Sequence, residues 1–338
     1  LPGHRILRTV GHQAPVQSLR ALADGRIVVR TGGGEAFVWG VEGDRPDFRV
    51  DLGGPARLGR SMAAFEGQLV VCLENGPLTV FDLGDGRRVR TFRTHPGVAI
   101  CVEISSDGTG LATGGSDRNL RVWDAVSGEC TQTLKGHEAF VSSVAWHPDG
   151  SRVVTASADG TARLWNLEEG RCTQVFTGHN GPVRGLSLDS DGRFVATAGQ
   201  DGLVGLWDLE SGENLRFLRG HRGSVVSVAV VGTAVVAGGE DGTVRLWGLG
   251  EGESRSVIRL ANPSLDFAVT RDESMLVAAF GSEVSYVPLR HAVGVQLPLV
   301  LAESAASGEL SGRERQFQSH LDEARKLIAS EAMEEAVD

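Results

Sequence analysis

Residues 136–179 read GHEAFVSSVAWHPDGSRVVTASADGTARLWNLEEGRCTQVFTGH, and this stretch decides the fold. Its short apolar runs are interrupted by Asp149-Gly150, Asp159-Gly160 and Glu169-Gly170. Asp-Gly between apolar runs favours tight hairpin turns, because these turns need a positive φ that Asp and Gly tolerate. The stretch therefore predicts four short antiparallel strands joined by turns.

The same pattern recurs along the chain, marked by an aromatic residue at a nearly constant interval. Successive gaps between these residues are 42, 42, 42, 42, 40 and 39. The aromatic residues are Trp39, Phe81, Trp123, Trp165, Trp207, Trp247 and Tyr286. A period in this range indicates one supersecondary unit copied several times, since a single unit cannot bury its apolar face alone.

The period and the Gly-His and Trp-Asp pairs resemble the WD40 repeat, in which four strands make one blade of a propeller. The resemblance covers roughly residues 5–290, and the near-regular repeats are similar to those of prokaryotic members. It implies an all-β, seven-bladed WD40 β-propeller over residues 1–290. A linker and an amphipathic helical tail are expected over residues 291–338.

In the WD40 family, a His, a Ser or Thr, an Asp and a Trp form a hydrogen-bonded chain across each blade. Carried over to this sequence, the full set is His137, Ser157, Asp159 and Trp165 in blade four. Glycines stand at the position of Ser157 in blades three, five and six: Gly115, Gly199 and Gly239. The resemblance therefore implies incomplete chains in those three blades.

A Ser, a His and an Asp in one repeat also suggest a hydrolase triad. The structural interpretation is favoured because the His and the Asp recur in four blades, whereas a nucleophile needs one site with an oxyanion hole. The four cysteines show no CxxC spacing, and the repeat explains most of the nine histidines. The sequence thus predicts no catalytic residue, no metal site and no cofactor.

Composition narrows the choice of partner and compartment. The net charge is −10, from 43 acidic and 33 basic residues, which disfavours nucleic acid and anionic membranes as partners. The sequence contains no run of 18 apolar residues of the kind that would predict a membrane span. Its first residues do not show the charged and then apolar pattern of a signal peptide. We interpret the cysteines as small buried hydrophobes of a protein in a reducing compartment, the cytoplasm.

Two segments are expected to close or extend the ring. Arg5 to Val10 precedes Gly11-His12 as an outer strand precedes each later Gly-His, so we expect it to complete blade seven beside Tyr286. Val293 to Leu297 is a rival for the same place.

Beyond residue 302, apolar residues follow a helical period at Phe317, Leu321, Ala324 and Ile328. The final stretch resembles the start of a tetratricopeptide-type helical hairpin, which implies a longer parent protein. The alternative is an acidic tail whose helix docks on the side of the propeller.

Function must be argued from sites, because one fold supports many functions. The leading hypothesis is a non-catalytic protein–protein interaction scaffold or sensor module, a monomeric propeller within a larger bacterial signalling or assembly protein. Its partner, a protein or peptide, is expected on the top face, which consists of the Gly-His loops and the turns between second and third strands. Variable loops on a rigid scaffold are where recognition is concentrated. The candidate contacts are Phe140, Asn180, Arg222, Ser116, Gln200 and Glu240.

Three alternatives remain open at this point. Phe140 could instead pack beneath its own loop. The propeller could be a structural spacer, or it could hold an enzyme or small-ligand site in its central channel. The expected channel entrance is mixed and mostly neutral, with Gln17, Ala99, Ser142, Arg184 and Val226.

Overall fold

The computed structural model describes residues 9–22, 24–40, 46–52, 62–65, 67–73, 77–92, 95–249, 254–259, 264–270, 275–280 and 282–288. The chain divides into two units, Leu1–Leu301 and Ala302–Asp338, and the first contains all the described residues. The predicted linker, amphipathic helix and helical hairpin of residues 291–338 lie outside the described residues.

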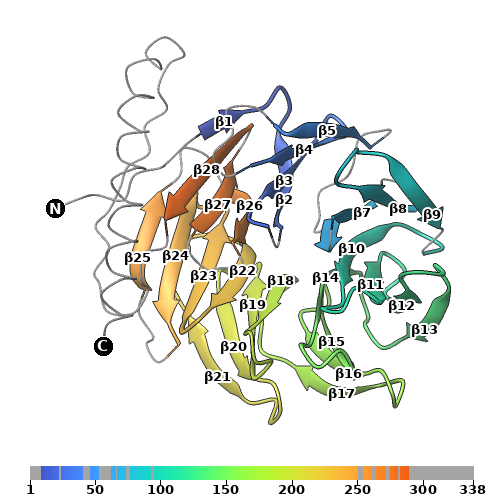
Figure 1. Ribbon diagram of the computed structural model, residues 1–338. Coiled ribbons are helices and arrows are strands. Elements are labelled where there is room, and N and C mark those ends of the chain that lie inside the picture. The colour runs from blue at the N-terminus through green and yellow to red at the C-terminus, as the bar shows by residue number, and fades with distance from the viewer. Residues whose placement is uncertain are drawn as a thin grey trace, which may run out of the picture. The chain divides into compact units, whose positions relative to one another are not determined.

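Seven four-stranded antiparallel sheets surround a central axis in the described part of the chain, so the predicted all-β, seven-bladed propeller is confirmed (Figure 1). In the first six blades the strands follow chain order from the axis outward. Blade one comprises β2 (Val16–Ala21), β3 (Ile27–Thr31), β4 (Glu35–Trp39) and β5 (Phe48–Asp51). Blade two comprises β6 (Met62–Phe65), β7 (Gln68–Cys72), β8 (Leu78–Asp82) and β9 (Arg88–Phe92).

The middle blades are the most regular part of the ring. Blade three comprises β10 (Ala99–Ile104), β11 (Gly110–Gly115), β12 (Leu120–Asp124) and β13 (Cys130–Leu134). Blade four comprises β14 (Val141–Trp146), β15 (Arg152–Ser157), β16 (Ala162–Asn166) and β17 (Arg171–Phe176). Blade five comprises β18 (Val183–Leu188), β19 (Phe194–Gly199), β20 (Val204–Asp208) and β21 (Asn214–Leu218). Blade six comprises β22 (Val225–Val231), β23 (Ala234–Gly239), β24 (Thr243–Gly248) and β25 (Ser254–Arg259).

Blade seven is completed by a strand from the beginning of the chain. It comprises β26 (Ser264–Val269), β27 (Met275–Phe280), β28 (Glu283–Pro288) and β1 (Thr9–Gly11). Strand β1 pairs antiparallel with β28, with Thr9 opposite Ser285 and Gly11 opposite Glu283. The predicted N-terminal closure is therefore confirmed, and the rival segment Val293 to Leu297 lies outside the described residues.

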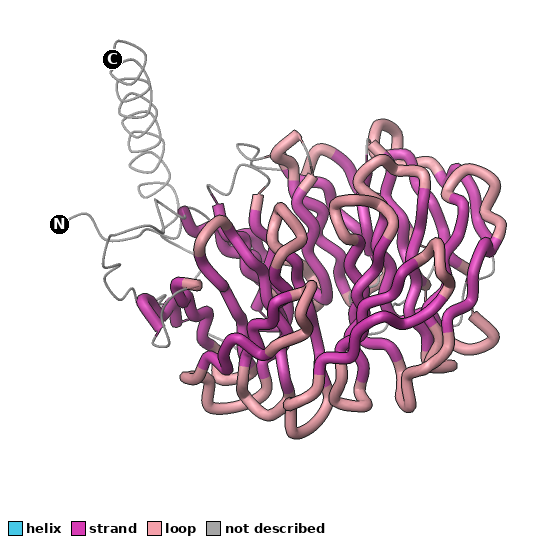
Figure 2. The backbone as a smooth tube through the Cα atoms, turned by 90° about the horizontal axis from the view of Figure 1, so that it is seen from below, coloured by secondary structure: helices cyan, strands magenta, loops and turns pink. Residues whose placement is uncertain are grey.

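Tight turns join the second and third strands, as the Asp-Gly pairs predict. Gly160 and Gly202 have φ values of 86° and 82°, a region that disfavours any residue with a Cβ. A Cβ on Gly160 would also lie 3.3 Å from the carbonyl oxygen of Gly181 in the next blade. Figure 2 shows the strands running between two opposite rims of loops. We call the rim that contains these turns the top face.

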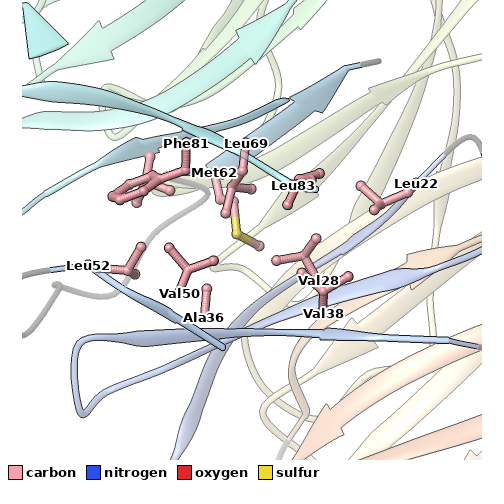
Figure 3. Close-up of a cluster of buried hydrophobic side chains, with 11 residues drawn as sticks. Leu22, Val28, Ala36, Val38, Val50, Leu52, Met62, Leu69, Phe81 and Leu83 are labelled. Atoms are coloured by element: carbon pink, nitrogen blue, oxygen red, sulfur yellow. The ribbon is translucent and has the colours of Figure 1, made fainter. Parts of the chain in front are cut away.

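The hydrophobic core lies between neighbouring blades. Leu22, Val28 and Val38 of blade one pack against Met62, Leu69 and Phe81 of blade two (Figure 3). A similar cluster joins blade seven to blade one, with Val277 and Ala279 against Leu19 and Ile27. Because every blade buries its faces against two neighbours, the ring must close to remove the last apolar face from water.

One prediction about the cysteines is wrong. Cys72 and Cys101 are buried, but Cys130 is exposed on β13 and Cys172 is half-buried on β17. Both of these lie on the outermost strand of a blade, which has a neighbouring strand on one side only. All four thiols are free.

Candidate functional site

A chain of side-chain hydrogen bonds crosses blade four from the top face to the core. The distance from His137 Nδ1 to Asp159 Oδ2 is 2.7 Å, and that from His137 Nε2 to Thr155 Oγ1 is also 2.7 Å. Trp165 Nε1 donates to Thr155 Oγ1 at 2.8 Å. Because a carboxylate only accepts, Nδ1 carries the imidazole proton, and Nε2 accepts from the Thr155 hydroxyl.

Ser157 is not part of this chain, so its predicted place in the tetrad is wrong. Its Oγ lies 3.0 Å from the carbonyl oxygen of Phe140 and 3.2 Å from that of Ala139. Thr155 and Ser157 are two residues apart on β15 and share one face of the strand, but only Thr155 is deep enough to reach Trp165. Ser157 instead ties the turn to the loop that enters blade four.

Blades three and five contain the same complete chain, contrary to the expectation from their glycines. His95 Nε2 lies 2.9 Å from Thr113 Oγ1, and His179 Nε2 lies 2.8 Å from Thr197 Oγ1. A Cβ on Gly115 would lie 2.2 Å from His95 Nδ1, so the glycine gives the His–Asp pair its space. Sequence alone offered a usable signal here: a Thr recurs ten residues before the Trp in three blades.

Blade six has an incomplete chain, though for a different reason from the one expected. His221 Nδ1 lies 3.0 Å from Asp241 Oδ1, as in the other blades. Ala237 pairs with Arg245 in blade six, as Thr155 pairs with Arg163 in blade four. Ala237 therefore occupies the position of Thr155 but has no hydroxyl. His221 Nε2 is consequently buried without a hydrogen-bond partner.

The Thr–His–Asp geometry resembles a triad but cannot present a nucleophile to a substrate. Thr155 is 0% exposed, and its Oγ1 already accepts a hydrogen bond from Trp165. Satisfying buried polar groups in this way stabilises the blade, by about 1 kcal/mol net for each bond. The arrangement therefore acts structurally.

Burial sets the charge state of these pairs. Burial lowers the pKa of His95, His137 and His221 below 6.5, although hydrogen bonds to their Asp partners act in the opposite direction. Burial raises the pKa of Asp159, but hydrogen bonds from Thr161, from the Glu138 amide and from His137 outweigh it and lower the value to about 2. Each pair thus consists of a neutral imidazole and a carboxylate at neutral pH.

These shifts predict a loss of stability on acidification. Below pH 6.5 the unfolded chain takes up protons on its histidines while the folded chain does not, so the unfolding free energy falls as pH decreases. The lowered pKa of Asp159 adds a second decrease below about pH 4. We expect the Tm to be constant above pH 7 and to fall between pH 6.5 and 5, measured by thermal melts. A slope that is unchanged in a variant with His95, His137 and His221 all replaced by Gln would contradict this origin.

All six candidate contact residues are exposed on the top face. Ser116, Gln200 and Glu240 follow the second strands of blades three, five and six directly. Asn180 and Arg222 follow the histidines of blades five and six, and their amides donate to Asp201 and Asp241. The same Asp that anchors each His therefore also fixes the loop that carries a candidate contact.

Phe140 lies in the loop that enters blade four and is 45% exposed rather than packed beneath that loop. Its carbonyl oxygen accepts hydrogen bonds from the Ala158 amide at 3.0 Å and from Ser157 Oγ. The side chain therefore projects from a backbone that is held at two points.

The channel entrance on this face differs slightly from the expected set. Gln17, Ser142, Arg184 and Val226 are each the second residue of a first strand, where the ladder contains an irregularity. Ala99 is the first residue of β10 and is buried, and Ile100 occupies the equivalent position. Arg184 is exposed, and its Nη2 donates to Gln200 Oε1 at 3.0 Å.

A cavity of about 400 Å³ lies at the other end of the channel, lined by Arg20, Trp146, Asp189 and Asp266 among others. Its charged groups already have partners. Asp266 Oδ2 accepts from Ser18 Oγ and from the Leu19 amide, both at 3.1 Å, and lies 3.7 Å from Arg20 Nη1. Asp266 thereby joins blade seven to blade one, so its carboxylate has a structural role.

Among the described residues, no group of three or more His, Cys, Asp or Glu side chains is placed to hold a metal ion. That same part of the chain contains no helix long and apolar enough to span a membrane.

Comparison with known proteins identifies the repeated unit. The profile of the WD domain, G-beta repeat, matches residues 86–124, 128–166, 170–208 and 212–248. Protein groucho of Drosophila melanogaster is 32% identical over 111 residues, which cover 31% of this chain and 15% of that protein. The chain thus spans only a small part of this relative. Each matched segment covers the fourth strand of one blade and the first three strands of the next. The protein is therefore a seven-bladed β-propeller that contains four WD40 repeats.

Proposed function

We propose that this propeller is a non-catalytic protein-interaction module whose top face binds a protein or peptide. It would act as a scaffold or sensor part of a larger cytoplasmic protein, of prokaryotic type. The proposal rests on one observation above all: six exposed, mutually different side chains are carried by loops that the repeated His–Asp pairs hold in place. A rigid scaffold with variable loops is suited to recognition rather than to chemistry.

Two further points support the proposal. WD40 repeats typically serve protein interaction, and in blades three to five the threonine hydroxyl beside the His is buried against a Trp. Phe140 adds an exposed aromatic side chain of the kind that often supplies much of the binding energy in an interface.

The test uses peptides selected from a phage-displayed library against the immobilised, folded propeller. We expect the selected peptides to lose about tenfold or more in affinity when Phe140 and Arg222 are both changed to Ala, with the melting curve unchanged. The matched control is Leu215→Ala with Val126→Ala. Leu215 is 46% exposed on an outer strand and Val126 is 74% exposed on another turn, so the control removes similar side chains away from the top face. Peptides that bind the top-face variant as tightly as the wild-type propeller would refute the proposal, whatever their affinity for the control variant.

A further inference from the structure

We propose that Phe140 and Arg184 form one two-point site that binds a peptide segment with an acidic side chain close to an apolar one. This inference rests on the proposed function, because it assigns the chemistry of the partner at the same face. Ser157 is the positioning residue of the site.

Blade four alone among the regular blades presents a large apolar side chain here. The Ala158 amide donates to the carbonyl oxygen of Phe140, and the equivalent bonds in blades three, five and six go to Val98, Pro182 and Ser224. Blade four is also the one that has Ser157 where the others have glycine. The Ser157 hydroxyl is within hydrogen-bonding distance of the Ala139 and Phe140 carbonyl oxygens. The blade with the exposed aromatic side chain is therefore also the one whose entering loop is held by this hydroxyl.

Arg184 is the matching charged group on the next blade. The equivalent positions in other blades are uncharged, namely Gln17, Ile100, Ser142 and Val226. Arg184 Nη2 donates one of its two hydrogens to Gln200 Oε1, which leaves four of the five N–H donors of the guanidinium outside this hydrogen bond. Arg184 makes no ion pair with any residue in the described part of the chain, so its charge is not neutralised locally.

A hydrogen bond between the two blades limits the distance between Phe140 and Arg184. The hydroxyl of Ser142, on β14, donates to the carbonyl oxygen of Val183, on β18. Phe140 is two residues before Ser142, and Arg184 directly follows Val183. Three Cα steps of about 3.8 Å and about 7 Å across the hydrogen-bonded Ser142 and Val183 put the Cα atoms of Phe140 and Arg184 within roughly 19 Å of each other. A short extended segment can therefore contact both.

The chemistry of the pair determines the class of ligand. The second Nη2 hydrogen and the adjacent hydrogen of Nε or Nη1 form a two-donor face, which matches a carboxylate that accepts two parallel hydrogen bonds. The Phe140 ring offers apolar contact area at low entropic cost. An acidic residue a few positions from an apolar residue satisfies both groups, whereas a basic residue would be repelled by Arg184.

The experiment compares peptides selected against the wild-type propeller with matched versions in which the acidic residue is replaced by Gln or Lys. We expect the acidic peptide to bind about tenfold more tightly than its Gln version, and this difference to disappear in Arg184→Gln. In Arg184→Glu the preference should reverse towards the Lys version. Arg118→Gln, a change of an exposed Arg on the same face, is the matched control and should leave the preference unchanged.

Ser157→Ala tests the positioning role separately. It should weaken peptide binding severalfold, while Ser157→Thr, which keeps the hydroxyl, restores it. Selected peptides without acidic residues, or equal effects of Arg184→Gln and Arg118→Gln, would overturn this inference while the proposed function still stands. Peptides that are insensitive to Phe140→Ala with Arg222→Ala would instead refute the proposed function.

Discussion

Deleting residues 1–11 is expected to lower the Tm by about 5 °C or more and to cause association. The deletion removes β1 and its ladder with β28, and with it the closure of the ring. Each lost backbone hydrogen bond contributes roughly 1 kcal/mol, and 1 kcal/mol corresponds to about 2–4 °C in a protein of this size. The freed edge of β28 is a template for pairing with a second molecule.

The matched control for this deletion removes residues 1–8 and leaves Thr9–Gly11 in place. We expect the control to melt as the full chain does and to remain at its original size in light scattering coupled to gel filtration. Identical melting curves for the two deletions would show that β1 does not hold the ring closed.

Thr155→Val is expected to destabilise the protein by about 2–4 kcal/mol. Valine preserves the shape of the side chain but leaves two buried groups, His137 Nε2 and Trp165 Nε1, without partners. A buried unsatisfied group costs about 1–3 kcal/mol. Denaturant unfolding, with the slope checked for constancy, measures the difference.

Ser157→Ala is the control for this prediction. It removes a hydroxyl two residues away, on the same strand, that bonds to loop carbonyls rather than to His137. We expect a loss of about 1 kcal/mol for that variant. If Ser157→Ala proved the more destabilising change, the hydroxyl that stabilises the blade core would be Ser157 after all.

The periodic features of the sequence predicted the architecture because they are set by local rules. Aromatic residues every 42 positions and Asp-Gly turns determine the blade length, the strand order and the hairpins. The arrangement of Arg5 to Val10 ahead of Gly11-His12 predicted the partner of β28, since each later Gly-His follows an outer strand.

Sequence reasoning failed where the answer depends on how deep a side chain lies in its blade or on how the repeats are aligned. Thr155 and Ser157 are both hydroxyl residues on one face of β15, and only their depth in the blade decides which one reaches Trp165. That depth does not follow from periodicity. Ala99 was misplaced by one residue for another reason: the other four entrance residues each lie five positions after a His, and the same offset from His95 gives Ile100.

The pairing of β1 with β28 also has a consequence for biosynthesis. The ribosome makes the strand that finishes the ring before it makes any of the strands of the first six blades, and domains generally fold in the order of their synthesis. Its partner emerges almost at the end of the ring, because residue 9 pairs with residue 285. Throughout translation, the nascent N-terminal segment must therefore stay unpaired and unaggregated. The entropic cost of closing a loop grows only slowly with its length. The late synthesis of β28 therefore delays ring closure but has little effect on the stability of the finished ring.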